Sequence, residues 1–189
     1  MGNDPLTTGV EEGPRHDESL LIRAAVVTDA AAVTAIYNEG IRGRGATFEV
    51  LERTPADIAP WFSHAAATDD VTHPFLVAER QETVVGWIRA SAYRSRDAYR
   101  RIAEYSVYVA PAAQGQRVGD ALMVAFLPAC ADAGLTKLVA RIFPENAASL
   151  ALCARHGFRV VGTYEQHAPL DGVWRDVVIV ERRFPENQS

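Results

Sequence analysis

The chain has 189 residues, of which 48% are hydrophobic and 23% are charged. That composition is typical of a globular protein with enough apolar residues to bury a sizeable core. The formal net charge of −5 argues against a general nucleic-acid-binding protein, which needs a basic surface. Two cysteines do not make a disulfide framework in a chain of this length, so they predict a reducing, cytoplasmic setting.

The ends and apolar runs of the chain carry further expectations. No run approaches the roughly 20 apolar residues of a membrane-spanning helix, and no basic segment followed by an apolar one opens the chain. We therefore expect no membrane partner and no secretion signal. Residues 1–19 hold three glycines, two prolines and five acidic residues, which predicts a disordered extension before a folded domain over residues 20–185.

The hydrophobic pattern predicts strands and helices in an irregular order. Strands are expected at 20–25, 73–79, 84–90, 105–109, 137–143, 158–164 and 173–182, and helices at 29–39, 54–67, 118–129 and 146–156. The glycines between 40 and 45 should end the first helix, and Pro128 should bend the third. The order β-α-α-β-β-β-α-β-α-β-β predicts a mixed α+β domain rather than a doubly wound nucleotide-binding fold.

The segment between the strand at 105–109 and the next helix is a candidate anion site. It begins at Pro111, contains Gly115 and Gly119, and opens a helix whose first N–H groups lack partners. It lacks the Gly-Lys-Ser/Thr of a Walker loop and one of the three glycines of a dinucleotide fingerprint. An ordinary strand–loop–helix connection is the alternative reading.

Two separated motifs resemble the GCN5-related N-acetyltransferase superfamily. Gln114 and Gly119 stand as in its pyrophosphate loop, and Asn146 with the later Gly157-Phe158 resembles its second signature. A capped helix with a buried Phe158 would explain the second motif as packing alone. The element order agrees with the superfamily, so the resemblance implies a mostly antiparallel sheet with helices on both faces. Arg117 departs from the usual glycine and would be strained at positive φ.

The resemblance implies acetyl-CoA as co-substrate. No metal is expected, because the histidine pairs His64/His73 and His156/His167 show no familiar ligand spacing. The pantetheine arm of acetyl-CoA would pair with the strand that contains Val107, Tyr108 and Val109, as an added strand does. Asn146 would reach the pantetheine amide or the thiol end. The pyrophosphate would be held by the loop and first helical turn, which comprise Gln114, Gly115, Gln116, Arg117, Val118, Gly119 and Asp120.

Four further segments resemble phosphinothricin-type acetyltransferases. Residues 104–109 read Glu-Tyr-Ser-Val-Tyr-Val, residues 94–99 read Arg-Ser-Arg-Asp-Ala-Tyr, Thr47 precedes Phe48, and residues 172–176 read Gly-Val-Trp-Arg-Asp. The resemblance implies that Glu104, at the head of the central strand, is the catalytic base. The substrate would be held by Arg94, Arg96 and Tyr99, with Phe48 as a wall of the pocket. A solvated glutamate and a solvated basic turn are the alternatives.

The predicted function is therefore acetyl transfer to the α-amine of an amino-acid analogue with an oxyanion-like side group, such as L-phosphinothricin, methionine sulfone, methionine sulfoximine or arsinothricin. This activity would serve detoxification, and the resemblance implies a homodimer. An acetyltransferase for another small amine or a peptide N-terminus, and a non-catalytic CoA-binding module, are the alternatives. Cys153 stands where the superfamily has a proton-donating tyrosine, and residues 168–171 depart from related pockets, which leaves the general acid and the substrate open.

Overall fold

The computed structural model describes residues 20–63 and 72–188. The predicted disordered extension at 1–19 and the last residues of the predicted second helix lie outside these ranges. The strands are β1 (Leu20–Ala24), β2 (Phe75–Arg80), β3 (Thr83–Ala92), β4 (Ile102–Val109), β5 (Lys137–Ile142), β6 (Arg159–Leu170) and β7 (Val173–Arg183). The α-helices are α1 (Ala30–Arg42), α2 (Pro55–Ile58), α3 (Val118–Asp132) and α4 (Ala147–Arg155). Short 3₁₀ segments are η1 (Val27–Asp29), η2 (Ala59–Trp61), η3 (Asp97–Tyr99), η4 (Pro111–Ala113) and η5 (Pro185–Asn187).

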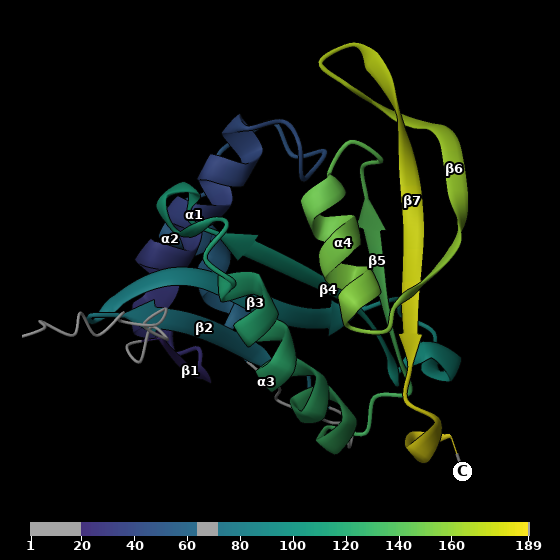
Figure 1. Ribbon diagram of the computed structural model, residues 1–189, viewed down its shortest axis with the longest axis horizontal. Helices are drawn as coiled ribbons and strands as arrows, with labels where there is room; N and C mark the ends of the chain where they lie inside the picture. The colour runs from purple at the N-terminus through teal and green to yellow at the C-terminus, as the bar shows by residue number, and fades with distance from the viewer. Residues whose placement is uncertain (1–19, 64–71, 189) are drawn as a thin grey trace, which may run out of the picture.

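The strands form one seven-stranded sheet in the order β1-β2-β3-β4-β5-β7-β6. The β4–β5 pair is parallel and every other neighbouring pair is antiparallel. The predicted mixed, mostly antiparallel α+β fold is thereby confirmed. Two-residue turns close the β2–β3 and β6–β7 hairpins, and both residues of each turn have positive φ, as tight hairpin turns require. The long β6–β7 hairpin projects beyond the rest of the sheet (Figure 1).

Helices cover both faces of the sheet, because side chains alternate along the central strands. Ile88 and Ala90 of β3 lie in the larger core with α3 and α4, whereas Trp87 lies in the second core with α1 and α2. In Figure 1, α3 and α4 lie in front of the sheet, and α1 and α2 lie toward its far side. The face that carries Trp87 is the one on which the candidate site lies.

Two helix boundaries differ from the sequence prediction. α1 continues through Gly40 to Arg42 rather than ending at the glycines. Gly40 is required for packing, because a Cβ there would lie 2.6 Å from Cε1 of Tyr108. The second helix is α-helical only to Ile58 and then tightens into η2, where Pro60 has no N–H to give. The third helix, α3, runs through Pro128 as one element.

The parallel ladder between β4 and β5 is short, and its end positions the site. It pairs Ile102 with Lys137 and ends at Glu104 opposite Val139. Beyond Glu104, β4 remains bonded to β3, but its other edge leaves β5. Glu104 is therefore the third residue of β4, not its head as expected, because the strand begins earlier at Ile102.

Candidate active site

A cleft of about 550 Å³ opens where β4 and β5 separate. Its walls are the loop that follows α1, the middle of β4, the end of β5 and part of the β6–β7 hairpin. The lining residues are Tyr37, Ala46, Thr47, Phe48, Glu49, Val50, Leu51, Arg53, Glu104, Tyr105, Ser106, Tyr108, Arg141, Phe143, His167 and Val177. The cleft combines aromatic walls with a few charged groups, which is typical of a site for a small polar ligand.

Glu104, the predicted base, lines this cleft beside Arg141. The Arg141 guanidinium donates two hydrogen bonds to the carboxylate, from Nε to Oε1 at 2.8 Å and from Nη2 to Oε2 at 2.7 Å. The Glu104 side chain is 24% exposed and that of Arg141 is 50% exposed, so the pair is open to solvent and ligand. This fork fixes the carboxylate in the cleft while leaving room for water at its oxygens.

The edge of β4 and the loop after it offer backbone groups to a long ligand. Val107 to Val109 pair with Ile88 to Gly86 of β3 on one side, and their other edge lies past the end of the β5 ladder. The first hydrogen bond at the head of α3 runs from Ala121 N to Arg117 O, so the N–H groups of the preceding turn remain for another acceptor. These features fit an extended pantetheine arm that ends in a pyrophosphate.

In the loop before α3, Arg117 replaces the glycine that is usual in the superfamily, and its backbone adopts the conformation that a glycine would take. Gly115 has φ of 74° and Arg117 has φ of 62°, so both occupy the left-handed region. The positive φ that was expected to strain an arginine is therefore present in this chain. Gly119 has a different role: a Cβ there would meet Leu152 at 3.3 Å, so this glycine allows α3 to approach α4.

Several predicted cofactor residues already have partners for their side chains. Gln114 Nε2 donates to Val109 O at 3.3 Å, and Gln116 Nε2 donates to Ala112 O at 2.8 Å. Asn146 caps α4, because its Oδ1 accepts from the Ser149 N–H at 3.1 Å. Their proposed contribution to cofactor binding therefore comes chiefly from backbone groups or from rearranged amides.

Asp120 links the start of α3 to the C-terminal end of α4. Its carboxylate accepts from Arg155 Nε at 3.0 Å and lies 3.1 Å from His156 Nε2. The hydrogen bond from Arg155 lowers the pKa of Asp120, with partial burial opposing and His156 adding to the decrease. The Asp120 carboxylate thus supports the loop, and its N–H remains the group suited to a phosphate.

The predicted substrate residues fall into two groups. Phe48 lines the cleft and packs edge-on against Phe143, with ring centroids 4.8 Å apart. Arg94, Arg96 and Tyr99 lie in the segment between β3 and β4 and do not line the cleft. Both arginines are exposed, and among the described residues neither has a carboxylate partner.

The basic segment nevertheless begins close to Glu104. Ser91 is the cross-strand partner of Glu104, and the segment leaves the sheet two residues later. Tyr93 makes an edge-on contact with Tyr99, with centroids 5.9 Å apart, and the Arg94 guanidinium lies 5.2 Å from the Tyr93 ring. These contacts fold the segment back on its own start.

Cys153 shares a buried hydrogen bond with Tyr105, whose hydroxyl lies 2.8 Å from its sulfur. Burial raises the pKa of the Cys153 thiol and raises that of the Tyr105 phenol. Because the thiolate is the reactive form of cysteine, this environment disfavours covalent catalysis by Cys153. Tyr105 therefore places a phenol next to Cys153, the position at which the superfamily motif has a tyrosine.

Sequence reasoning missed Arg141 and His167, both of which line the cleft. Arg141 belongs to a predicted strand, but its pairing with Glu104 depends on the register between two strands far apart in sequence. His167 comes from the β6–β7 hairpin, where its ring stacks on Tyr164 with centroids 5.0 Å apart. Residues 168–171, which differ from those of related enzymes, were expected to alter the pocket. Instead, Leu170 is buried behind Phe48, and Asp171 pairs with Arg44 at 2.9 Å.

The described residues contain no group of three or more metal-ligating side chains placed to hold an ion. Within the same residues, no helix is both long and apolar enough to cross a membrane.

Comparisons with known proteins agree with this geometry. The model of the acetyltransferase (GNAT) family matches residues 35–158. A phosphinothricin N-acetyltransferase of Alcaligenes faecalis is 36% identical over 162 residues, which make up 85% of this chain and 81% of that protein. An L-methionine sulfoximine/L-methionine sulfone acetyltransferase of Salmonella typhimurium is 30% identical over 170 residues, covering 90% of this chain and 98% of the relative.

Among solved structures, a GNAT superfamily phosphinothricin acetyltransferase from Sinorhizobium meliloti in complex with acetyl-CoA has a TM-score of 0.79 and 31% identity, over 88% of this chain and 89% of that one. The predicted superfamily, the resemblance to phosphinothricin-type enzymes and the enzyme class are confirmed. The chain therefore belongs to the acetyltransferase (GNAT) family, whose members take the acetyl group from acetyl-CoA.

Proposed function

We propose that this enzyme acetylates the α-amine of an amino-acid analogue that bears an oxyanion-like side group, of the phosphinothricin, methionine sulfone, methionine sulfoximine or arsinothricin type. The names of two relatives, a phosphinothricin N-acetyltransferase and a methionine sulfoximine/methionine sulfone acetyltransferase, support this substrate class. The observation that carries the proposal is Glu104, held by Arg141 in a cleft beside the open edge of β4.

The proposed reaction is direct transfer within a ternary complex. Glu104 accepts a proton from the substrate ammonium through one water, because a carboxylate fixed at the cleft wall can serve as a general base. The free amine then attacks the thioester carbonyl carbon, so a C–N bond forms as the C–S bond breaks, and the nitrogen loses its second proton to solvent. The leaving CoA thiolate takes its proton from solvent or from a nearby acid, for which the Tyr105–Cys153 pair is a candidate.

The cofactor contacts follow from the exposed backbone. The edge of Val107–Val109 pairs with pantetheine, and the amides of residues 115–120 hold the pyrophosphate. Asn146 stands at the head of α4, with its Nδ2 donating to Gly45 O at 3.3 Å, and exchanges this bond for one to the pantetheine end.

The substrate contacts use two of the cations that have no carboxylate partner among the described residues. Arg94 and Arg96 clamp an anionic group of the substrate, Tyr99 donates a hydrogen bond, and Phe48 forms an apolar wall. The unpaired state of both guanidinium groups, in a chain of net charge −5, supports an anionic ligand. We further propose a cytoplasmic homodimer with a detoxifying role.

The test is CoA release from acetyl-CoA by the purified protein with a panel of amines. The panel contains L-phosphinothricin, methionine sulfone, methionine sulfoximine, common amino acids, a peptide with a free N-terminus, spermidine and an aminoglycoside. Turnover restricted to the oxyanion-bearing amino acids is expected. Turnover only of the peptide or of cationic amines would contradict the substrate class, and acetyl-CoA binding with no turnover would favour a non-catalytic module.

The role of Glu104 is tested with Glu104→Gln, which keeps the shape of the side chain and can accept one of the two hydrogen bonds from Arg141 but cannot accept the proton. We expect kcat to fall by roughly 10²- to 10⁴-fold while the affinity for acetyl-CoA, measured by calorimetry, stays unchanged. Glu82→Gln, in the β2–β3 turn, is the matched control and should behave as the wild-type enzyme. A kcat near the wild-type value in Glu104→Gln would reject Glu104 as the base.

A further inference from the structure

Arg89 is a partly buried cation that the proposed reaction does not use. It lies in β3 on the face that carries Trp87, opposite Phe75 of β2 and Ser106 of β4. Its guanidinium carbon lies 4.3 Å from the centroid of the Trp61 ring and 5.9 Å from that of Phe75. The aromatic rings hold the group by cation–π contact, which fixes its position without neutralising its charge.

Within the part of the chain that the structure describes, no carboxylate pairs with Arg89, and its enclosed Nε has no hydrogen-bond acceptor. Burial lowers its pKa to about 10, so the group is still protonated at neutral pH. A desolvated cation without an anion is costly, which makes an unpaired one a candidate ligand site. Arg23, which is also partly buried, instead has both Asp29 and Glu79 as partners.

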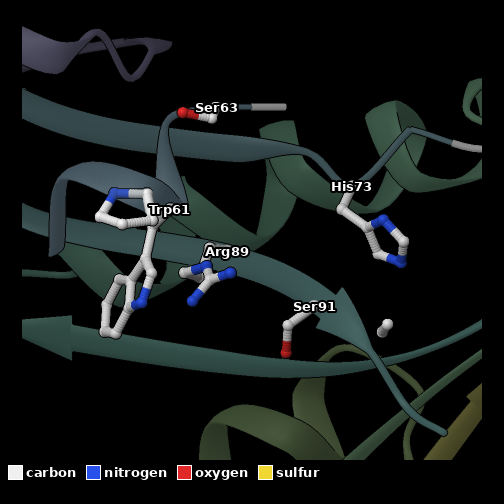
Figure 2. A pocket seen from close by; sticks show the side chains of 7 residues that line it. Trp61, Ser63, His73, Arg89 and Ser91 are labelled. Atoms are coloured by element: carbon white, nitrogen blue, oxygen red, sulfur yellow. The ribbon is translucent and has the colours of Figure 1, made fainter. Parts of the chain in front are cut away.

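A recess of about 160 Å³ lies against Arg89, and Figure 2 shows the side chains around it. It is lined by Pro60, Trp61, Ser63, His73, Arg89, Ser91 and Ala92. Because a water molecule takes up about 30 Å³ of liquid, this space admits a group the size of a carboxylate together with water. The recess therefore provides a cation, hydroxyl groups and an aromatic wall at one place.

The strand register connects this recess to the catalytic carboxylate. Arg89 is opposite Ser106, and Ser91 is opposite Glu104, so Arg89 and Glu104 are diagonal neighbours on one face of the sheet. Diagonal neighbours in an antiparallel pair lie about 7–8 Å apart. Ser91 Oγ donates to Glu104 O at 3.2 Å and so links the two places. The amine and the carboxylate of one α-amino acid, which branch from a single carbon, can reach both groups together.

We infer that the Arg89 recess binds the α-carboxylate of the acceptor amino acid and thereby directs its α-amine toward Glu104. This inference rests on the proposed function and extends it: Arg89 selects α-amino acids over simple amines, while Arg94 and Arg96 serve the side group. A guanidinium fork suits a planar carboxylate, so Lys at this position is an incomplete replacement.

The first test compares an acceptor that the wild-type enzyme acetylates with its decarboxylated amine. The KM of the amino acid should rise roughly 10- to 100-fold in Arg89→Met, as expected for losing a charged hydrogen-bonded pair, and less in Arg89→Lys. The KM for acetyl-CoA should stay unchanged, and the decarboxylated amine should be insensitive to both substitutions. Arg42→Met, which removes an exposed arginine on α1, is the control.

A binding measurement separates this inference from the proposed function. L-Phosphinothricin is titrated calorimetrically into wild-type and Arg89→Met protein without acetyl-CoA, and thermal unfolding checks that both are folded. Binding that depends on Arg89 would support the recess even if the enzyme acetylated none of the amine panel. Equal KM values for the amino acid and its decarboxylated amine in the wild-type enzyme would overturn the inference and leave the acetyltransferase assignment intact. Absence of any binding by the wild-type protein would also overturn it.

Discussion

At the scale of single residues, Asp120 should make the free energy of unfolding depend on pH, and its partners determine the direction of that dependence. The hydrogen bond from Arg155 lowers its pKa in the folded state below the ordinary value of about 3.9. A carboxyl group with a depressed folded pKa contributes stability above its unfolded pKa, and this contribution is lost as pH falls through the folded pKa. The Asp120 side chain is 18% exposed, but Arg155 is 52% exposed, so solvent screens the interaction.

We therefore expect Asp120→Asn to lower the free energy of unfolding by about 0.5–1 kcal/mol at neutral pH. The difference from wild type should shrink as pH falls through the lowered folded-state pKa of Asp120, because the wild-type side chain then becomes uncharged as well. Urea unfolding across this pH range measures it. Asp132→Asn, an exposed change at the other end of α3, should show no such loss. A deficit of equal size at every pH would contradict the electrostatic origin.

The same scale shows what sequence reasoning could and could not find in the site. Glu104 and Phe48 were predicted from local motifs, and both line the cleft. Arg141 could not be predicted, because its contact with Glu104 depends on where the β4–β5 ladder ends. Arg89 was missed for a similar reason: nothing local in the sequence indicates that a strand arginine faces an aromatic ring rather than a carboxylate.

At the scale of elements, the order of the helices and strands could be predicted from hydrophobic periodicity and turn residues. The ends of the helices could not, because they depend on tertiary packing. All four α-helices and seven strands of the described residues occur in the expected order. Gly40 shows the difference, since a glycine reads locally as a helix breaker but here lies within α1 against Tyr108. The β6 strand also extends to Leu170, because the tight turn at residues 171–172 lies beyond the end predicted from hydrophobicity.

Gly40 gives a prediction about how α1 packs. An alanine methyl group would meet Tyr108 at 2.6 Å and 2.8 Å, and Tyr108 is itself held by Trp87, with stacked rings 4.8 Å apart. Overpacking of this kind costs about 1–3 kcal/mol, more than the roughly 1 kcal/mol that alanine gains in helix propensity. Gly40→Ala should therefore be less stable than wild type by about 1 kcal/mol and should have a higher acceptor KM, because Tyr108 lines the cleft.

The control for Gly40→Ala is Gly45→Ala in the following loop. A Cβ at Gly45 would have ordinary contact with Gly43 O at 3.7 Å, so stability and KM should be unchanged. Thermal unfolding and steady-state kinetics of the two variants provide the measurement. Equal stability of both variants would show that Tyr108 moves aside without cost.

The loop before α3 gives a second prediction at this scale. Arg117 has φ of 62°, a conformation that costs an L-residue about 1–2 kcal/mol and glycine almost nothing. Arg117→Ala and Arg117→Gly both remove the guanidinium, but only glycine removes the Cβ responsible for the strain. The glycine variant should be the more stable of the two by about 1 kcal/mol, after allowing for its greater freedom when unfolded. Equal unfolding midpoints in urea would contradict a strained loop.

At the scale of the whole molecule, three of the described arginines that have no carboxylate partner lie in one stretch of the chain. Many arginines have carboxylate partners, as Arg42 has Glu52 and Arg44 has Asp171. Arg89, Arg94 and Arg96 lack such partners among the described residues, although the chain is acidic overall. All three lie in β3 or directly after it, so positive charge gathers beside Glu104, the proposed catalytic base. Such a field attracts an anionic acceptor and disfavours polyamines.

The β6–β7 hairpin exposes apolar side chains that a second copy of the chain could cover. β6 is one of the two edge strands of the sheet, and its residues from Arg159 to His167 are exposed on both faces. Its exposed apolar side chains, together with those at the start of β7, are Val160, Val161, Tyr164, Val173 and Trp174. An exposed apolar edge strand is a liability that proteins usually cover, and the proposed homodimer would cover it with the same hairpin of a second copy.

The dimer prediction is tested by two matched substitutions of exposed valines. Val161, 51% exposed in β6, and Val124, 65% exposed on α3, are each replaced by lysine. A lysine buried without a partner at an interface opposes association, whereas one on a free helix surface does not. Light scattering after size exclusion should give a dimer for wild type and Val124→Lys and a monomer for Val161→Lys, with similar unfolding temperatures as evidence of intact folding. A wild-type monomer would reject the homodimer, and a Val161→Lys dimer would place its interface elsewhere on the surface.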